Sequence, residues 1–115
     1  MNNTNNIEAT IGITDLDLEN YIVDCFEGGS TYWIDELIVG KGRTTYDFIY
    51  EDINIGIKTH AGSVRSLHKG MLLKALSTMS KEYPKAFNRL LYGDYDAFDT
   101  DILLQIALFG EVTYG

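Results

Sequence analysis

Hydrophobic side chains recur at helical spacing soon after the polar start of the chain, and they predict a helix over residues 15–27. Its apolar face comprises Leu18, Ile22, Cys25 and Phe26. Thr14 and Asp17 have the spacing of a capping box, which satisfies backbone N–H groups at a helix N-terminus. Gly28 and Gly29 are expected to end the helix, because glycine adopts the left-handed conformation after a last turn without a Cβ penalty.

The second half of the chain is predicted to be helical. A helix over residues 66–82, capped by Ser66, is amphipathic, with its basic side chains on or near the solvent side. Its apolar side chains are Leu67, Met71, Leu72, Ala75, Leu76, Met79 and Tyr83. Pro84 suits the first turn of a further helix over residues 85–92, where its missing N–H costs little.

The last predicted helix, residues 101–109, is apolar on nearly all faces, so we expect it to be deeply buried. Asp99 or Thr100 is expected to cap its N-terminus. Glycines end the last two helices, at Gly93 and Gly110. Residues 111–115 are predicted to form a short tail or an edge strand.

The pattern in the middle of the chain favours strands. Residues 30–39 are ambiguous, because β-branched and aromatic residues surround an Asp-Glu pair that suits a short helix. Residues 40–43 are predicted to form a flexible turn. In residues 44–60 the apolar side chains alternate, first at Tyr46, Phe48 and Tyr50 and then at Ile53, Ile55 and Ile57. A period of two is typical of a half-buried strand, so one or two antiparallel strands are predicted here, with Gly62 closing the sheet.

These elements predict an α+β fold with an N-terminal helix, a small antiparallel sheet of two to four strands and then three helices, the last one buried. Residues 1–13 are expected to form a loose polar leader, in which residues 7–13 could form a short strand. Residues 14–115 are expected to form one domain, because no repeat, low-complexity block or linker interrupts them.

Composition limits the setting in which such a domain works. The chain has 115 residues, 17 acidic and 9 basic side chains, a net charge of −8 and one cysteine. A single cysteine forms no internal disulfide, which favours a reducing cytoplasm. The start of the chain does not suit a secretory signal, and no stretch approaches the roughly 18 apolar residues of a membrane span. We therefore expect no membrane association.

The net charge is unevenly distributed along the chain. Residues 1–57 carry a net charge of −9, residues 58–89 carry +6 and residues 90–115 carry −5. The basic segment consists of Lys58, Arg65, Lys69, Lys74, Lys81, Lys85 and Arg89. These side chains either give the molecule a dipolar surface or are neutralised by acidic partners in the fold.

Residue types that could support catalysis or metal binding are present, but their spacing is unfavourable. Residues 94–101 are rich in aspartate, yet a calcium loop would need glycine at the sixth position and glutamate at the twelfth, where the chain has Asp99 and Gln105. Cys25 lies on the core face of the first helix, and nothing places it near His60 or His68. We therefore predict a protein that is not an enzyme, with no catalytic residues, no metal and no cofactor.

The residues from Gly28 to Trp33 are the most distinctive feature of the sequence. Two glycines are followed by Ser30, Thr31 and then Tyr32 next to the one tryptophan of the chain. Trp33 either closes the base of the core or, with Tyr32, frames a ligand pocket or anchors a partner. Lys41 and Arg43, in a mobile turn, would suit a phosphate. The predicted partner- or ligand-binding residues are Tyr32, Trp33, Asp35, Glu36, Lys41, Arg43, Tyr46, Asp47, Tyr50 and Glu51.

Three segments together resemble a family of small uncharacterised proteins encoded by bacteriophages and prophages. They are CFEGGSTYW, KGMLLKALSTMSKEYPKAFNRLL and DYDAFDTDILLQIALFGEVTYG. The residues that match the recurring runs are Phe26, Glu27, Gly28, Gly29, Tyr32, Trp33, Tyr83, Pro84, Leu104, Gln105, Phe109, Gly110, Glu111, Tyr114 and Gly115. The chain departs at Glu82, where the family usually has lysine, and residues 35–65 do not align. We expect a partner-specific surface in that middle segment.

The resemblance implies a phage origin, the cytoplasm of an infected bacterium as the site of action and no established activity. Our first hypothesis is an anti-defence inhibitor, for example an anti-CRISPR protein, that binds a bacterial defence protein. A second hypothesis is a sponge that sequesters a nucleotide second messenger, with Trp33 or a tyrosine stacking on the base. A third is a structural or replication accessory that binds a phage protein. No direct nucleic-acid binding is expected, and self-association into a homodimer fits all three hypotheses.

Overall fold

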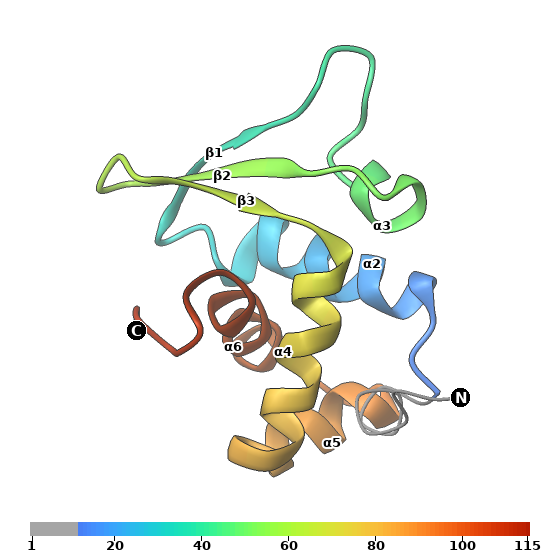
Figure 1. Cartoon of the computed structure of the whole chain (residues 1–115). Helices are drawn as coiled ribbons and strands as arrows, with labels where there is room; N and C mark the ends of the chain where they lie inside the picture. The colour runs from blue at the N-terminus through green and yellow to red at the C-terminus, as the bar shows by residue number, and fades with distance from the viewer. Residues whose placement is uncertain (1–11) are drawn as a thin grey trace.

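The computed structural model of the protein describes residues 12–115, so most of the predicted polar leader and of the strand over residues 7–13 lies outside the described part. The elements follow in the order α2 (Asp15–Asp24), the π-helical turn η1 (Cys25–Gly29), β1 (Ile34–Ile38), α3 (Asp47–Glu51), β2 (Ile55–Thr59), β3 (Val64–Leu67), α4 (Lys69–Glu82), α5 (Pro84–Tyr92) and α6 (Ala97–Phe109). The expected α+β architecture is confirmed. Figure 1 shows the sheet above the main helices.

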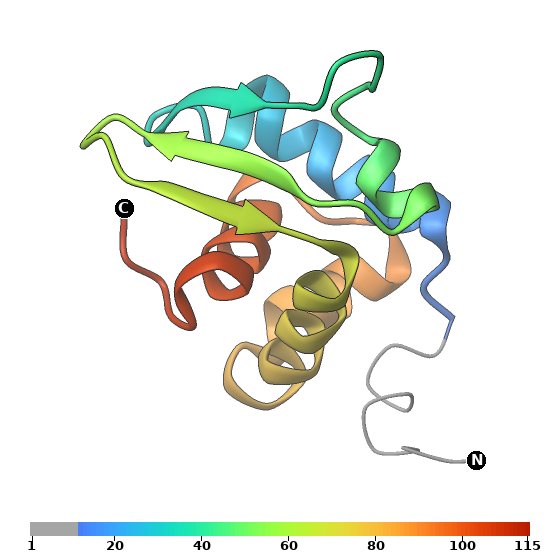
Figure 2. The ribbon, with the colours of Figure 1, turned by 45° about the horizontal axis from the view of Figure 1, so that its top comes forward.

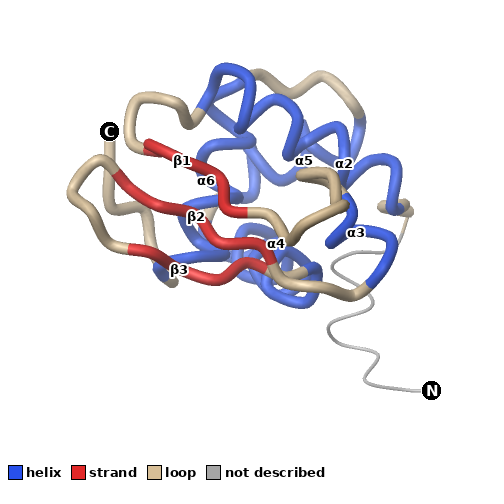
Figure 3. The backbone as a smooth tube through the Cα atoms, turned by 90° about the horizontal axis from the view of Figure 1, so that it is seen from above, coloured by secondary structure: helices blue, strands red, loops and turns tan. Residues whose placement is uncertain are grey.

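The three strands form an antiparallel sheet in the order β1-β2-β3. Ile55, Ile57 and Thr59 of the central strand are all buried. Period-two geometry places these three side chains on one face. The helices lie beneath this face, as the turned view in Figure 2 and the view from above in Figure 3 make clear. No helix of the described part of the chain covers the opposite face.

Helix α6 is the centre of the core, as its apolar sequence predicts. Leu103 and Leu104 are completely buried, and polar Thr100, Asp101 and Gln105 are buried with them. The helix contacts α4, η1, α2, α5 and β3. After its exposed first turn, the helix is covered by these elements, which explains the nearly uniform hydrophobicity of the rest.

The first helix begins as predicted. The Thr14 hydroxyl accepts a hydrogen bond from the Asp17 N–H, and the Asp17 carboxylate accepts one from the Thr14 N–H. The prediction for Gly28 and Gly29 is wrong, because neither has a positive φ and both belong to η1. Gly29 is instead a close-approach residue, since a Cβ there would lie 2.8 Å from the Ala97 carbonyl oxygen.

Residues 46–50, predicted as a strand, belong mostly to the short helix α3. The Asp47 carboxylate accepts hydrogen bonds from the Thr44 N–H at 2.9 Å and from the Thr44 hydroxyl at 2.8 Å, which stabilises the helix start. Phe48 and Ile49 are both buried. Neighbouring residues of a strand point to opposite faces, whereas a helix lets both of these side chains reach the core.

The boundaries of the later helices differ from the prediction in two places. Ser66 is not a helix cap but a member of β3, paired with Gly56, and the helix begins at Lys69. Helix α6 begins at Ala97 and is capped by Asp96, with Asp99 completing a capping box. The remaining predictions for the helical half are confirmed, with Pro84 at the start of α5 and left-handed glycines at its end and at the end of α6. The tail after α6 forms no strand.

Candidate functional site

A buried carboxylate joins the distinctive aromatic run to the last helix. Asp101 of α6 is 5% exposed. Its Oδ1 accepts hydrogen bonds from the Ser30 hydroxyl at 2.6 Å and the Trp33 indole N–H at 2.8 Å. Its Oδ2 accepts bonds from the Tyr32 hydroxyl at 2.6 Å and the Gln105 amide at 2.9 Å. We call these five residues the Asp101 cluster.

The cluster also holds the segment after α6 in place. Gln105 Oε1 accepts hydrogen bonds from the backbone N–H groups of Thr113 and Tyr114, both at 2.7 Å. The Tyr114 ring stacks on Trp33, with ring centroids 5.3 Å apart and planes at 5°. Asp101 and Gln105, four residues apart on one face of α6, therefore fix two chain segments against each other. Sequence reasoning missed both residues, although two buried polar positions in so apolar a helix are the signal that could have revealed them.

Tyr32 and Trp33, predicted together as binding residues, have different environments. Trp33 is 2% exposed, so it closes the core and offers no surface to a partner. Tyr32 is 52% exposed at its ring, while its hydroxyl bonds to Asp101. Desolvation and the hydrogen bond to that carboxylate raise the pKa of Tyr32 to about 12. The phenol therefore stays protonated and remains a donor near neutral pH.

The other predicted binding residues lie along β1 and beyond its far end. Asp35 is exposed and lies 4.0 Å from the Lys58 ammonium and 3.6 Å from His60 Nδ1. Glu36 is exposed on the same strand. Lys41 is exposed in the turn after β1, as expected for a flexible loop, and Arg43 of that turn forms an ion pair with Glu51 of α3.

Tyr46, the residue before α3, and Tyr50 of α3 bond to acidic side chains of η1 and α2. The Tyr46 hydroxyl donates to Glu27 at 3.1 Å, and the Tyr50 hydroxyl donates to Glu19 at 2.7 Å. The pKa of Tyr46 is raised by burial first and then by Glu27, and the pKa of Tyr50 is raised mainly by its bond to Glu19. We call Glu19, Glu27, Tyr46, Tyr50 and Glu51 the α2–α3 face. Its α3 members were predicted as binding residues, whereas Glu19 and Glu27 were not.

The side chains that could support nucleophilic or metal chemistry do not lie together in the structure. Cys25 is completely buried, and its thiol donates to the Thr100 carbonyl at 3.1 Å. Burial raises the pKa of this thiol to about 12, which keeps it from acting as a thiolate. His60 and His68 are exposed on the sheet side. Within residues 12–115, no group of three or more histidine, cysteine, aspartate or glutamate side chains could hold a metal ion.

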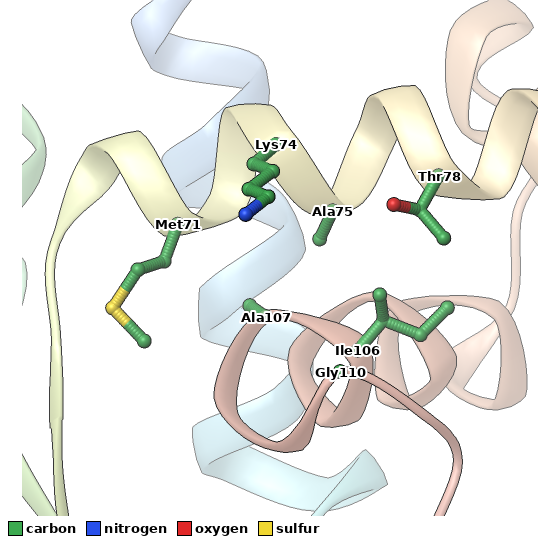
Figure 4. Close-up of a pocket in the computed structure, with 7 residues that line it drawn as sticks. All are labelled: Met71, Lys74, Ala75, Thr78, Ile106, Ala107 and Gly110. Carbon is green, nitrogen blue, oxygen red and sulfur yellow. The ribbon is translucent and has the colours of Figure 1, made fainter.

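A hollow of about 300 Å³ lies between α4 and α6. Figure 4 shows the side chains that line it, among them Lys74 and Ala75 from α4 and Ile106 from α6. Lys74 is exposed and makes no ion pair with any described residue. The other residues described as lining the hollow are uncharged, so Lys74 is the single charged group that they offer to a ligand.

A larger, more open hollow of about 510 Å³ lies beside the Asp101 cluster. We call it the Asp101 hollow; its walls include Tyr32, Phe98 and Tyr114, with Asp101 among the lining residues. A smaller hollow of about 290 Å³ adjoins it and shares Gly29 and Ala97. The charged residues that line this smaller hollow are Asp24 and Glu27. Phe98, 69% exposed, was not among the predicted binding residues.

The basic middle segment is partly neutralised by the fold, as one of the two interpretations of its charge expects. Lys69 pairs with Asp15 at 2.5 Å, and Arg89 pairs with the buried Asp99 at 2.7 Å. The Arg65 guanidinium lies 4.9 Å from the centre of the Phe109 ring. Acidic α2 and basic α4 are thus tied together, whereas the exposed Arg65, Lys74, Lys81 and Lys85 form no ion pair with any described residue.

Comparisons with other proteins give this chain no family assignment. No protein-family model matches the sequence, and neither curated proteins nor solved structures show significant similarity to the chain. No helix in the described part of the chain combines the length and the apolar character needed to cross a membrane.

Proposed function

We propose that this chain is a phage-encoded binding protein without enzymatic activity, and that it inhibits a bacterial defence protein in the host cytoplasm. The support from the sequence is the resemblance to phage proteins and the partner-specific segment expected in residues 35–65. The support from the structure is the α2–α3 face, where part of that segment is presented at the surface.

One observation carries the proposal. Tyr46, which caps α3, and Tyr50 of α3 both donate to carboxylates of the preceding helical segments, at 3.1 and 2.7 Å, so their rings are held against an acidic surface. Tyrosine held in this way provides a large contact area that has already lost much of its rotamer freedom. Arg43, the nearest basic side chain in the sequence, is already paired with Glu51. The face is therefore anionic and aromatic, which suits a basic surface on a protein partner.

The nucleotide hypothesis receives less support from the structure. Trp33 precedes β1 and is buried, whereas Lys41 and Arg43 follow the other end of that strand. Trp33 and the predicted phosphate-binding pair lie at opposite ends of a strand and do not line one pocket, so a tyrosine would have to stack on the base instead. Protein binding is consequently the function that the arrangement of predicted residues favours.

The test is protection of phage by the protein in living cells. Bacteria carrying individual defence systems would express the chain before infection, and the efficiency of plaquing would be compared with cells lacking it. We expect protection against one system and co-purification of the chain with a component of that system. If no defence system is inhibited and no bacterial protein co-purifies, the proposed function is wrong.

A matched pair of variants assigns the effect to the α2–α3 face. Glu19→Gln combined with Glu27→Gln removes two charges beside the tyrosines, and we expect it to reduce protection and co-purification. Glu82→Gln combined with Glu111→Gln removes the same number of charges at exposed positions outside the face and should preserve both. Light scattering on the purified proteins would show whether a homodimer forms and whether either variant alters it.

A further inference from the structure

We propose that the Asp101 hollow binds a cationic side chain, an arginine or a lysine, of the protein partner. This inference rests on the proposed function and specifies the chemistry of the partner's anchor residue. It also places the anchor beside α6, at residues that were not predicted as binding residues apart from Tyr32.

The first argument is an uncompensated buried charge. Asp101 is 5% exposed, and all four of its hydrogen-bond donors are neutral groups. It forms no ion pair with any residue in the described part of the chain. Asp99, two residues earlier on the same helix, is also buried but receives two bonds from Arg89, at 2.7 and 2.8 Å. The fold thus supplies a cation to one buried carboxylate of α6 and leaves the other without one.

The second argument is the aromatic wall of the hollow. Tyr32 and Phe98 are 52% and 69% exposed, and Tyr114 also lines the hollow. Arginine and lysine are attracted to the faces of such rings, and the attraction grows when the site excludes water. The volume of about 510 Å³ and the open shape admit a side chain that enters from a partner's surface. The rings therefore suit a guanidinium or an ammonium group, which the charge of Asp101 would attract without displacing any of its four hydrogen-bond donors.

The surrounding charges favour a cation over an anion. None of the residues described as lining this hollow or the adjoining one is Lys, Arg or His, whereas Asp24 and Glu27 line the adjoining hollow. Helix α6 begins here, but Asp96 Oδ1 already accepts a bond from the Asp99 N–H at 3.1 Å and offsets the positive helix end. A second basic residue of the partner would fit beside Asp24 and Glu27. We therefore expect a segment with two nearby basic side chains.

Nuclear magnetic resonance of the full chain provides a direct test. The probe is a capped Gly-Arg-Arg-Gly peptide, and the control is the same peptide with citrulline, a neutral analogue, in place of arginine. The Trp33 indole N–H donates to Asp101 Oδ1, so its resonance reports on the hollow. We expect saturable shifts of this resonance and of the Ala97 and Phe98 amides with the arginine peptide only. Phe98→Ala should weaken binding about threefold through loss of the aromatic contact.

Two control variants define the site. Val64→Ala shortens an exposed apolar side chain on β3 and should leave peptide binding unchanged. Asp24→Asn combined with Glu27→Gln should weaken binding, whereas Glu82→Gln combined with Glu111→Gln, with the same change of charge at exposed positions, should not.

The inference is overturned if the indole resonance does not move, or if the citrulline peptide shifts it equally. Shifts confined to Glu19, Tyr46 and Tyr50 would overturn it while leaving the proposed function intact. The same distinction applies in cells, where Phe98→Ala should reduce protection of phage. Full protection by Phe98→Ala, with loss of protection in a Glu19→Gln variant that changes the α2–α3 face alone, would contradict the inference alone.

Discussion

Asp99 and Asp101 are both buried on α6, but the fold stabilises their charges in different ways. Asp99 is completely buried and has a bidentate partner in Arg89, whose side chain remains 43% exposed. Asp101 depends on neutral donors from Ser30, Tyr32, Trp33 and Gln105. The stability of the fold should therefore depend on the cation beside Asp99. At Asp101 it should depend instead on the number of hydrogen bonds that the carboxylate can accept.

Replacing Arg89 by glutamine should make the protein more sensitive to acid. Burial alone raises the pKa of Asp99, but the bonds from Arg89 and from the Asp96 backbone N–H outweigh it and leave the pKa below its usual value. A lowered folded-state pKa stabilises the fold above the unfolded-state value of about 3.9, and that contribution is lost as pH falls through the folded-state pKa. In Arg89→Gln the burial remains and the cation is gone, so acid unfolding should begin at higher pH.

We also expect Arg89→Gln to lower the free energy of unfolding at pH 7, because it leaves the buried Asp99 carboxylate without its cationic partner. Urea unfolding at several pH values, followed by Trp33 fluorescence, measures both effects. Lys85→Gln, an exposed change of the same charge on α5, is the control. Parallel stability–pH curves for wild type and Arg89→Gln would contradict this account.

Asp101→Asn should destabilise the protein although it removes a charge and keeps the size of the side chain. The new amide group would face either Gln105 or the donors Ser30 and Trp33. Gln105 cannot rotate its amide to compensate, because its Oε1 already accepts two backbone N–H groups. We expect a loss of roughly 2 kcal/mol in the free energy of unfolding, measured in urea. An unchanged urea midpoint would show that the four donors do not depend on the carboxylate.

At the scale of elements, the contact between η1 and α6 depends on a single glycine. An ideal Cβ on Gly29 would lie 2.8 Å from the Ala97 carbonyl oxygen, whereas one on Gly28 would meet nothing within 4 Å. Neither glycine has a positive φ, so backbone strain does not enter the comparison. We predict that Gly29→Ala costs about 1–3 kcal/mol of stability through overpacking.

The matched variant Gly28→Ala should be neutral or stabilising by up to about 1 kcal/mol, since it reduces the freedom of the unfolded chain. Urea midpoints of the two alanine variants compare them directly. Equal effects at both positions would mean that the approach of η1 to α6 does not depend on the missing side chain.

The helices with strong local signals were predictable from sequence, and the exceptions have physical causes. The Thr14 capping box and the glycine stops of α5 and α6 depend on residues close in the chain, so they could be recognised. The alternation of Tyr46, Phe48 and Tyr50 predicts a strand where the structure has helix α3. Its type is decided by burial of the adjacent Phe48 and Ile49 against the rest of the fold.

Strand β3 and the cap of α6 could not be assigned for different reasons. The first three residues of β3 are exposed, and the strand is defined mainly by backbone pairing with β2, which leaves no apolar alternation in the sequence. Asp96 and Asp99 can each cap a helix, and in the structure they do so jointly, as the N-cap and the third helical residue of one capping box. Spacing alone does not separate these roles.

For the molecule as a whole, the Asp101 cluster shows the limit of reasoning along the chain. The hydrogen bond from Trp33 to Asp101 joins residues 68 positions apart, so no local spacing indicated it. The same cluster joins two segments that lie far apart in the sequence. GGSTYW and the end of the chain meet at Asp101 and Gln105, and a change in either segment would leave buried polar groups unpaired.

The central position of α6 predicts the order in which the molecule opens. The backbone of Leu103 and Leu104 is shielded by helices and by β3, so their amides should exchange with solvent only when the whole molecule unfolds. Their exchange free energies should equal the free energy of unfolding measured in urea. Amides in the exposed turn Gly40–Arg43, which follows the edge strand β1, should exchange orders of magnitude faster. If α6 instead exchanged faster than β2, the core would be organised around the sheet, and loss of the Asp101 cluster would be a local event rather than a global one.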